Sequence, residues 1–422
     1  MPASAGRPAR VVTIGAAFTG NKGAASMLQA VIDRLPERAT SIDITVLSTY
    51  PDDDEREAAT TNPHVTIVAL RPRSLLVSAW PLALLAWIFR RLGGTGRLWC
   101  RTPALRALAE ADLVIDLAGI SFVDGRGLSI LAYNTLMTGL PLLLGRPTMK
   151  AAQALGPFRR PLNRAAARRV LPRLATVVAR GEQTHNHLAE LGLTNVRRGA
   201  DLAFAMRVSD QARGDAALEL AQEGVDGPFI AISPSAVVER YCATESIDYV
   251  ELMARLASRI VDEGRQVVVV PHTARPGRPA GRMNDLPLCQ QVVTAAGRPG
   301  VVVVERSLAP ATLRAVIGAA DALVTSRFHA MISALATSRP VLVVGWSHKY
   351  AEVLAQLQLD QWVVDWRDAG IDDLHRRLRE MLDNSAAVEA QIAASLHELE
   401  RDALVSIDAA VELLRTAGVE VA

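Results

Sequence analysis

The sequence is poor in cysteine and nearly neutral, and each shortage excludes a class of protein. Its three cysteines, Cys100, Cys242 and Cys289, lie far apart and form no CxxC pair. A structural zinc site and a disulfide framework are therefore not indicated, and the pattern fits a reducing cytosol. The formal net charge of +2 over 422 residues gives no general case for nucleic-acid binding. Aromatic residues make up 4% of the chain and hydrophobic residues 50%, which suits a globular α/β protein and argues against disorder.

A hydrophobic signal region is also missing before the first strand-like run, so we expect a cytoplasmic protein. One almost wholly apolar run, residues 74–89, is shorter than the roughly 20 residues that span a bilayer and is interrupted by Pro81. Its tryptophans and flanking arginines predict an interfacial element that contacts the inner face of the cell membrane. The alternative is a helix packed against its own domain or against a dimer partner. The arginines are Arg71, Arg73, Arg90 and Arg91.

The chain does contain a regular alternation of short apolar runs with helix-length amphipathic sequence. Because 422 residues exceed the roughly 250–300 at which a single core stops growing, two domains are expected. The alternation predicts mostly parallel sheets covered by helices on both faces. The predicted strands of the first series are residues 11–14, 42–47, 65–70, 113–117, 148–152 and 175–179. Those of the second are residues 229–232, 267–270, 301–304, 322–324 and 341–344.

Between these two series, around residues 200–226, the sequence turns polar and charged. We therefore predict two consecutive doubly wound domains with a cleft between them, over residues 1–205 and 206–385. Residues 386–422 carry one apolar stripe at helical spacing and predict a long helix that packs back over one of the domains. A coiled-coil dimer, and hence a homo-oligomer, is the alternative. The stripe consists of Ile392, Leu396, Leu399, Ala403, Ile407, Val411 and Leu414.

The most informative segment follows the predicted strand 322–324. The apolar run stops at Thr325-Ser326 and delivers Arg327 and His329 to the loop at its carboxyl end. Ligands bind at that edge of open α/β sheets. Arginine presents a rigid fork to a carboxylate or phosphate, and histidine moves a proton near neutral pH. If the loop is extended, alternation aims both side chains the same way. The pair predicts an active site that acts on an acidic substrate.

Other polar residues lie where predicted strands of both domains end. Ser233 and His272 occupy two such ends in the second domain, where His272 is a second ionisable group or a hydrogen-bonded structural residue. The glycine-rich stretch 15–23 joins the first strand to the first helix, whose free N–H groups could bind an anion. Its spacing matches neither GxGxxG nor the P-loop. A purely structural turn is the alternative.

Two further strand ends lie in the first domain. Asp116 and Asp124 belong to a loop of small residues that is suited to hydrogen-bond sugar hydroxyls; alternatively, they cap the next helix. Arg180 directly follows the apolar run 177–179 and is predicted to project into the cleft. A surface salt bridge with Glu182 is the competing interpretation.

Together these motifs resemble the polysaccharide pyruvyl transferase family. The resemblance extends from about residue 9 to residue 366 and rests on the order and spacing of the motifs, of which the RxHA block is the most specific. The motifs are Gly20-Asn21-Lys22-Gly23, the strand and loop from Asp112 to Asp124, Leu155-Gly156-Pro157-Phe158, Arg180, Pro271-His272, Ser326-Arg327-Phe328-His329-Ala330, Pro340-Val341 and Lys349-Tyr350.

The resemblance implies a GT-B-like fold of two Rossmann-like domains, with the acceptor on the N-terminal side. It implies phosphoenolpyruvate as co-substrate, a glycan or lipid-linked sugar as acceptor, a pyruvate ketal as product, and neither a resident cofactor nor a metal. His329 would then be the general acid/base and Arg327 the clamp for carboxylate or phosphate. Arg180, His272 and Lys349 would be further anion ligands. The other substrate-binding candidates are Asn21, Gly23, Gly119, Asp124 and Ser233.

The chain departs from the family pattern in its N-terminal half. Ala24 and Ala25 follow the first motif and Gly181 follows Arg180, where members often have an acidic residue, and Leu117-Ala118-Gly119 replaces a triglycine-like turn. These differences concern the acceptor more than the donor. Two alternative functions use the same architecture: a nucleotide-sugar glycosyltransferase, and a non-catalytic glycan-assembly protein.

Overall fold

The computed structural model describes residues 7–39, 41–275, 277, 284–345 and 348–419. Residue contacts divide the chain into two compact units, each with its own parallel sheet. The first unit comprises the chain up to Thr19, Ala24–Met206 and the chain from Glu400 onward. The second comprises Gly20–Gly23 and Arg207–Leu399. The four residues Gly20–Gly23 thus group with the second unit, although their neighbours in sequence belong to the first.

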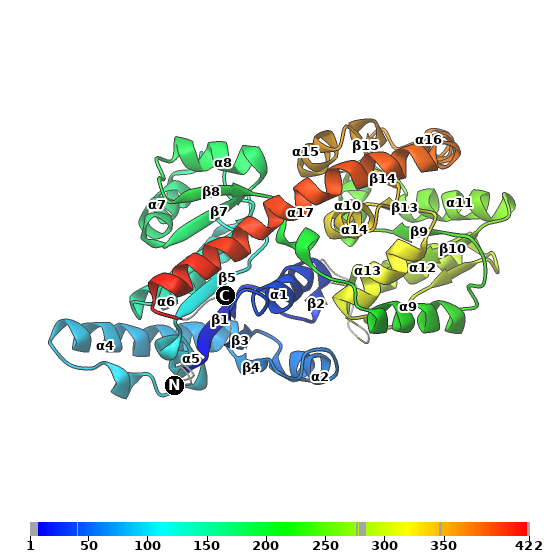
Figure 1. Ribbon diagram of the computed structural model, residues 1–422. Coiled ribbons are helices and arrows are strands. Elements are labelled where there is room, and N and C mark those ends of the chain that lie inside the picture. The colour runs from blue at the N-terminus through cyan, green and yellow to red at the C-terminus, as the bar shows by residue number, and fades with distance from the viewer. Residues whose placement is uncertain (1–6, 40, 276, 278–283, 346–347, 420–422) are drawn as a thin grey trace. The chain divides into compact units, whose positions relative to one another are not determined.

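The sheet of the first unit has seven strands in the order β4-β3-β1-β5-β6-β7-β8 (Figure 1). All neighbouring strands pair in parallel, and the order reverses between β1 and β5. The strands are β1 (Ala9–Ile14), β3 (Ile42–Ser48), β4 (Thr66–Ala69), β5 (Leu113–Asp116), β6 (Thr148–Gln153), β7 (Thr176–Arg180) and β8 (Val196–Gly199). Strands β5, β6 and β7 are buried along their whole length. This explains the apolar runs of β5 and β7, whereas β6 also buries the polar residues Lys150 and Gln153.

The sheet of the second unit has six strands in the order β12-β10-β9-β13-β14-β15, again all parallel (Figure 1). The strands are β9 (Phe229–Ser233), β10 (Gln266–Val269), β12 (Val301–Val303), β13 (Ala322–Thr325), β14 (Val341–Gly345) and β15 (Val363–Asp365). The order reverses at β9, which lies between β10 and β13. Ligands of doubly wound sheets bind outside the carboxyl ends of the strands at such a switch point.

Helices cover these sheets. The helices up to the end of the first sheet, with η4 following its last strand, are α1 (Lys22–Arg34), α2 (Pro51–Thr61), α3 (Pro72–Ser74), η1 (Leu75–Ala79), α4 (Trp80–Arg91), η2 (Arg97–Trp99), α5 (Pro103–Glu110), α6 (Leu128–Leu143), α7 (Pro161–Val170), η3 (Leu171–Arg173), α8 (Gly181–Glu190) and η4 (Leu202–Ala205). Those that follow are α9 (Asp210–Gln222), α10 (Ala236–Thr244), α11 (Tyr249–Asp262), α12 (Leu286–Ala296), α13 (Pro310–Ala319), α14 (Phe328–Leu335), α15 (His348–Gln356), η5 (Asp360–Trp362), α16 (Ile371–Asp383) and α17 (Ser385–Thr416).

The predicted fold class, α/β with two doubly wound domains, is confirmed, and each predicted strand is present. Two edge strands were missed. The sequence of β8, Val196-Arg197-Arg198-Gly199, has no apolar run, and β15 is three residues long. Edge strands of this kind are half-exposed and short, so hydrophobic pattern alone does not reveal them.

The apolar stripe of α17 is buried against its own chain, as its spacing predicts. Ile392, Ala403 and Leu414 are fully buried. In the part of α17 that belongs to the second unit, the Gln391 side chain donates to two backbone carbonyls at 2.7 and 2.9 Å. In the part that belongs to the first unit, the Ser406 hydroxyl accepts a backbone N–H of β6 at 3.1 Å. The stripe is therefore not available as the seam of a coiled coil.

Candidate active site

The site is built where strands β9, β10 and β13 of the second unit end. Thr325, the last residue of β13, donates its hydroxyl to the Ser233 carbonyl at 2.9 Å and accepts the Arg327 N–H at 2.9 Å. The Ser326 N–H donates to the same Ser233 carbonyl at 3.1 Å. These bonds fix the turn that leaves β13. Arg327 has an extended backbone (φ −107°, ψ 121°) and α14 begins at the next residue.

The expectation that Arg327 and His329 lie on one extended segment is wrong. Phe328 is the first residue of α14 and His329 the second, so strand alternation does not relate the two side chains. No capping residue marks this helix start in the sequence, because Arg327 is not one of the residue types that cap helices with a side chain. Arg327 and His329 nevertheless both lie close enough to His272 for their charges to lower its pKa.

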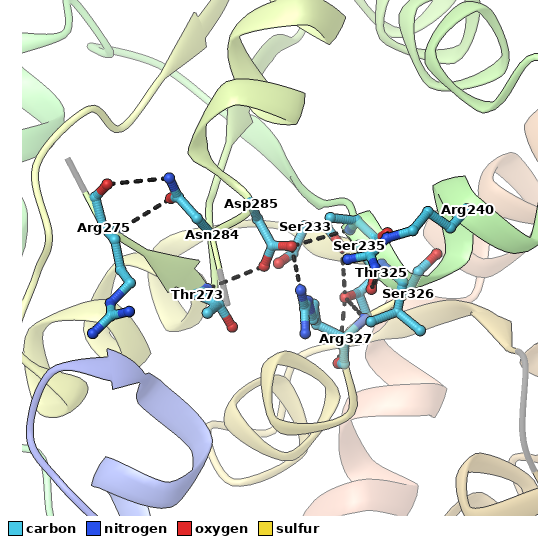
Figure 2. Close-up of polar contacts among 12 residues, drawn as sticks. Ser233, Ser235, Arg240, Thr273, Arg275, Asn284, Asp285, Thr325, Ser326 and Arg327 are labelled. Atoms are coloured by element: carbon cyan, nitrogen blue, oxygen red, sulfur yellow. Dashed lines mark hydrogen bonds and ion pairs between the residues drawn. The ribbon is translucent and has the colours of Figure 1, made fainter. Parts of the chain in front are cut away.

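Asp285, which sequence analysis did not single out, holds Arg327 in place. It directly precedes α12, its side chain is fully buried, and one of its oxygens accepts a bond from the Arg327 Nη2 (Figure 2). The same carboxylate accepts the backbone N–H of Ala236 at 3.0 Å and that of Thr273 at 3.1 Å. Burial raises the pKa of Asp285, whereas Arg327 and the two N–H groups oppose that rise. The arginine is 17% exposed, so a buried acid orients a guanidinium that reaches the surface.

Two histidines of different character lie beside this ion pair. The His272 and His329 rings are nearly parallel, with 18° between their planes and 6.5 Å between their centroids. His272 is buried, whereas His329 is half-buried. Burial first, and then the charges of His329 and Arg327, hold the pKa of His272 well below its ordinary value. His272 is therefore a neutral imidazole near pH 7, which leaves His329 as the proton carrier of the pair.

The N-terminal glycine-rich motif meets these histidines. Strand β2 (Gly20–Asn21) pairs antiparallel with β11 (Thr273–Ala274), directly after His272. A Cβ on Gly23 would lie 2.0 Å from the His329 Nδ1 and 2.3 Å from its Cγ. Only glycine allows the backbone to approach the imidazole so closely. The motif therefore packs directly against the His329 ring.

Within this motif, the Asn21 side chain accepts the Gly23 N–H at 3.1 Å. Lys22, between them, is also buried.

Two tyrosine hydroxyls also hold the turn between β13 and α14 in place. The Tyr350 hydroxyl donates to the Ser326 carbonyl at 2.9 Å, and the Tyr249 hydroxyl donates to the Ser326 Oγ at 2.8 Å. Burial raises the pKa of Tyr249, so it remains a neutral donor. The Lys349 Nζ lies 4.9 Å from the centre of the Phe328 ring, which brings a cation to the residue between Arg327 and His329.

Ser233 lies at this strand end as predicted, but its hydroxyl donates to the Val270 carbonyl at 2.9 Å and is buried. The structure thus brings together Arg327, His329, His272, Lys349, Asn21, Gly23 and Ser233 in the second unit. Arg180, Gly119 and Asp124 belong to the first unit.

In the first unit, Arg180 is buried and its Nη1 donates to Asp201 at 2.9 Å. The competing interpretation of a surface salt bridge with Glu182 is therefore wrong. Asp124 accepts the N–H groups of Arg159 and Arg160 at 2.7 and 3.1 Å, just before α7. Asp124 thus binds the segment that leads into α7. The alternative in which it caps the next helix is wrong, because that helix, α6, begins after Gly127 with no side-chain cap. Gly119 accepts a backbone N–H at 3.1 Å.

Asp116 does not reach the surface, contrary to the expectation that it faces a sugar. It is buried with Lys150, whose Nζ lies 2.5 Å from the Asp116 Oδ2, and it also accepts the Thr138 hydroxyl at 2.7 Å. Gln153 accepts Lys150 at 3.2 Å and donates to Asp116 at 3.0 Å. Burial lowers the pKa of Lys150, which Asp116 opposes. This closed network at the ends of β5 and β6 stabilises the first unit.

Comparison with known proteins assigns the chain to a family. The polysaccharide pyruvyl transferase family model matches residues 21–348, a range that includes Asn21–Gly23 of the glycine motif, His272, His329 and Arg327. The chain belongs to the polysaccharide pyruvyl transferase family. It is also similar to the amylovoran biosynthesis protein AmsJ of Erwinia amylovora, with 21% identity over 92% of this chain and 96% of that protein.

Solved structures similar to this family member show the same fold at low sequence identity. A UDP-N-acetylglucosamine 2-epimerase superposes with a TM-score of 0.61 at 13% identity, covering 98% of this chain and 97% of that one. The UDP-GlcNAc 2-epimerase of Neisseria meningitidis bound to UDP-GlcNAc gives 0.59 at 10% identity, with 95% and 99% covered. The S. aureus MnaA–UDP structure gives 0.57 at 12% identity, with 91% and 90% covered. These likenesses support the GT-B-like class.

Proposed function

We propose that this protein transfers pyruvate from phosphoenolpyruvate to a sugar of a cell-surface or exopolysaccharide precursor, which forms a pyruvate ketal and releases phosphate. The observation that carries the proposal is the Arg327–Asp285 pair beside His329 and a neutral His272, at the switch point of the second sheet of a pyruvyl transferase family member. An anion clamp next to a proton carrier is what an enol phosphate requires.

The reaction balances with one proton donor and no redox step. A proton is added to the methylene carbon of phosphoenolpyruvate, and the central carbon becomes oxocarbenium-like. One sugar hydroxyl attacks that carbon and loses its proton. Inorganic phosphate then leaves with the C–O bond electrons, and a second hydroxyl closes the ketal and loses its proton. Of the two protons released by the hydroxyls, one replaces the proton given to carbon and the other leaves with phosphate.

His329 is the proposed donor of the proton to carbon. General acids work best when their pKa is near the working pH, and histidine meets this condition. His272 stacks beside it and stays neutral, so it adds no second positive charge that would make protonation of His329 harder. Gly23 closes the space against one side of the His329 ring.

Arg327 is the proposed clamp for the carboxylate or phosphate of phosphoenolpyruvate. The buried Asp285 fixes one edge of its guanidinium, so that less side-chain entropy is lost when an anion binds. Lys349 supplies further positive charge near Phe328. No group of three or more His, Cys, Asp or Glu that could hold a metal occurs in the described ranges, and the proposed chemistry needs neither a metal nor a resident cofactor.

We assign the acceptor to the first unit, with Arg180, Gly119 and Asp124 as candidate contacts. Phosphoenolpyruvate is an intracellular metabolite, so the proposed reaction takes place in the cytoplasm. The acceptor is a glycan or a lipid-linked sugar.

The proposal is tested by incubating the purified protein with phosphoenolpyruvate and a panel of lipid-linked or synthetic glycosides, and measuring phosphate release. We expect acceptor-dependent release that His329→Ala reduces by about 10²–10⁴-fold, the usual contribution of a general acid. His397→Ala, an exposed histidine of α17, is the matched control and should keep full activity. Undiminished release by His329→Ala would contradict the catalytic assignment.

A nucleotide-sugar glycosyltransferase is the second candidate, because the fold is similar to those of enzymes whose structures contain UDP or UDP-GlcNAc. The same panel distinguishes the two. Turnover of a nucleotide sugar, with none of phosphoenolpyruvate, would favour the glycosyltransferase. No turnover of either donor would favour a non-catalytic glycan-assembly role.

A further inference from the structure

A long apolar face is exposed on the helix that runs from Pro72 to Arg91 in the first unit. Elements α3, η1 and α4 form this helix, which by length and composition is long and apolar enough to cross a membrane. Only 22% of an apolar 18-residue stretch of it is buried. Of the twelve large hydrophobic side chains exposed among the described residues, eight fall between residues 76 and 98. They are Leu76, Val77, Leu84, Trp87, Ile88, Phe89, Leu92 and Leu98. Large exposed apolar side chains gathered on one surface of a protein mark contact sites.

The opposite face of the helix is part of the core of the first unit. Its inner stripe consists of Leu75, Ala79, Ala83 and Ala86, all buried with residues of α5 and α6. The Trp80 indole N–H donates to the Leu136 carbonyl at 3.0 Å, and the Arg90 guanidinium donates to two carbonyls at the end of α6, each at 2.5 Å. Crossing a bilayer would break these contacts. The helix is therefore suited to lie along an apolar surface, with Val77, Leu84 and Ile88 on its outer side.

The sequence around this face carries charge of one sign only. Between Glu57 and Glu110 there is no acidic residue, whereas there are seven arginines. They are Arg71, Arg73, Arg90, Arg91, Arg97, Arg101 and Arg106. This segment alone contributes +7 to a chain whose formal charge is +2, so the rest of the chain carries −5. The apolar face thus lies in a segment that is free of acidic residues and carries seven positive charges.

We propose that this face docks on the surface of an anionic lipid bilayer, with the helix lying among the headgroups. The exposed apolar side chains enter the acyl boundary, and the arginines at both ends of the helix meet lipid phosphates. Arg91 lies 5.1 Å from the centre of the Trp87 ring, a pair suited to the headgroup level. The inference does not depend on the proposed reaction.

A second copy of the chain is the competing occupant, and the charge pattern disfavours it. In a two-fold dimer, the same patch of both subunits forms the interface. The arginines that flank the helix, such as Arg73 and Arg91, would then lie close to their own copies, and the segment has no acidic residue to neutralise them. Anionic lipid supplies the opposite charge instead, at about 1 kcal/mol, or fivefold in affinity, per arginine.

Flotation of the full chain with phosphatidylcholine vesicles, with and without phosphatidylglycerol, tests the proposal. We expect binding to the anionic vesicles that weakens as salt is raised. Val77→Glu/Leu84→Glu should lower the partition coefficient of the protein between vesicles and water at least about tenfold, since each change removes one apolar side chain that would be buried in the bilayer. Leu218→Glu on α9, which is 63% exposed, is the matched control and should bind as the wild type does. Arg73→Glu should weaken binding about fivefold or more on anionic vesicles only.

Three results would overturn the proposal. They are absence of wild-type flotation at low salt, flotation that the Val77→Glu/Leu84→Glu protein retains, and a wild-type dimer in light scattering that this variant dissociates. The last would assign the face to self-association. Because both altered side chains point outward, an unchanged circular dichroism spectrum and melting temperature will show that loss of flotation is not loss of folding.

Discussion

Replacing Gly23 with alanine should misplace His329 without unfolding the protein. The new Cβ would lie 2.0 Å from the His329 Nδ1, whereas ordinary contact begins near 3.4 Å. The ring must therefore move by roughly 1.4 Å, the difference of these two values. A misplacement of about 1 Å at a reacting group typically lowers the rate about 10²-fold. We expect a decrease in kcat of that order for phosphate release from phosphoenolpyruvate.

The effect on stability distinguishes this explanation from general damage. Gly23 lies in the first turn of α1 and does not have a positive φ, so alanine itself causes no backbone strain there and favours the helix by about 0.5–1 kcal/mol. Any loss of stability must therefore come from the clash with the His329 imidazole, and it should vanish when Gly23→Ala is made in the His329→Ala protein. A double-mutant cycle measured by urea denaturation gives this coupling between the two residues. Gly214→Ala, with no heavy atom within 4 Å of its Cβ, is the control and should be neutral or slightly stabilising. Full activity of Gly23→Ala, or additive effects in the cycle, would refute the reasoning.

Three further predictions concern buried ionisable groups, and urea denaturation tests each. Asp285→Asn should lower the free energy of unfolding by about 3–5 kcal/mol, because it leaves Arg327 without its buried carboxylate partner. Asp321→Asn, which changes a half-exposed ion pair, is the control and should lower it by under about 1 kcal/mol. Equal losses would contradict the claim that burial makes the Asp285 pair the more important one. The folded-state pKa of His272 lies below its unfolded value, so the folded protein binds fewer protons and becomes less stable as the pH falls below about 6.5, by up to about 1.4 kcal/mol per pH unit. The stability of His272→Asn should depend less steeply on pH than that of the wild type. An identical pH dependence would exclude His272 as its cause. Lys150→Met should lower the free energy of unfolding by about 3–5 kcal/mol, because it leaves the buried Asp116 without a neutralising charge. Adding Asp116→Asn should recover part of this loss. Strictly additive effects of the two substitutions would be inconsistent with a coupled pair.

The strands and the position of the site were predictable because parallel strands buried on both faces are continuous apolar runs. A polar residue directly after such a run must lie at the carboxyl edge, so Arg327, His272 and Ser233 were found without a structure. The same logic located Arg180 at the end of β7.

Their partners were not predictable, because side-chain pairing is set by packing and not by nearness in sequence. Asp285 precedes Arg327 by 42 residues and belongs to a different connection. Arg180 pairs with Asp201, 21 residues away, in a buried ion pair. Asp116 was expected to face a sugar because it ends a strand, yet Lys150 on the neighbouring strand covers it. A lysine inside an apolar run, as in Thr148-Met149-Lys150-Ala151, was the available signal for a buried ion pair.

The most direct test of the central claim is a transfer reaction run in D2O with phosphoenolpyruvate and a glycoside that supports phosphate release. If a protein acid delivers the proton to the methylene carbon, the ketal methyl group will carry one deuterium, which NMR detects as CH2D, and His329→Ala will form this product about 10²–10⁴-fold more slowly. A ketal methyl group without deuterium, or one formed by His329→Ala at the wild-type rate, would contradict the account.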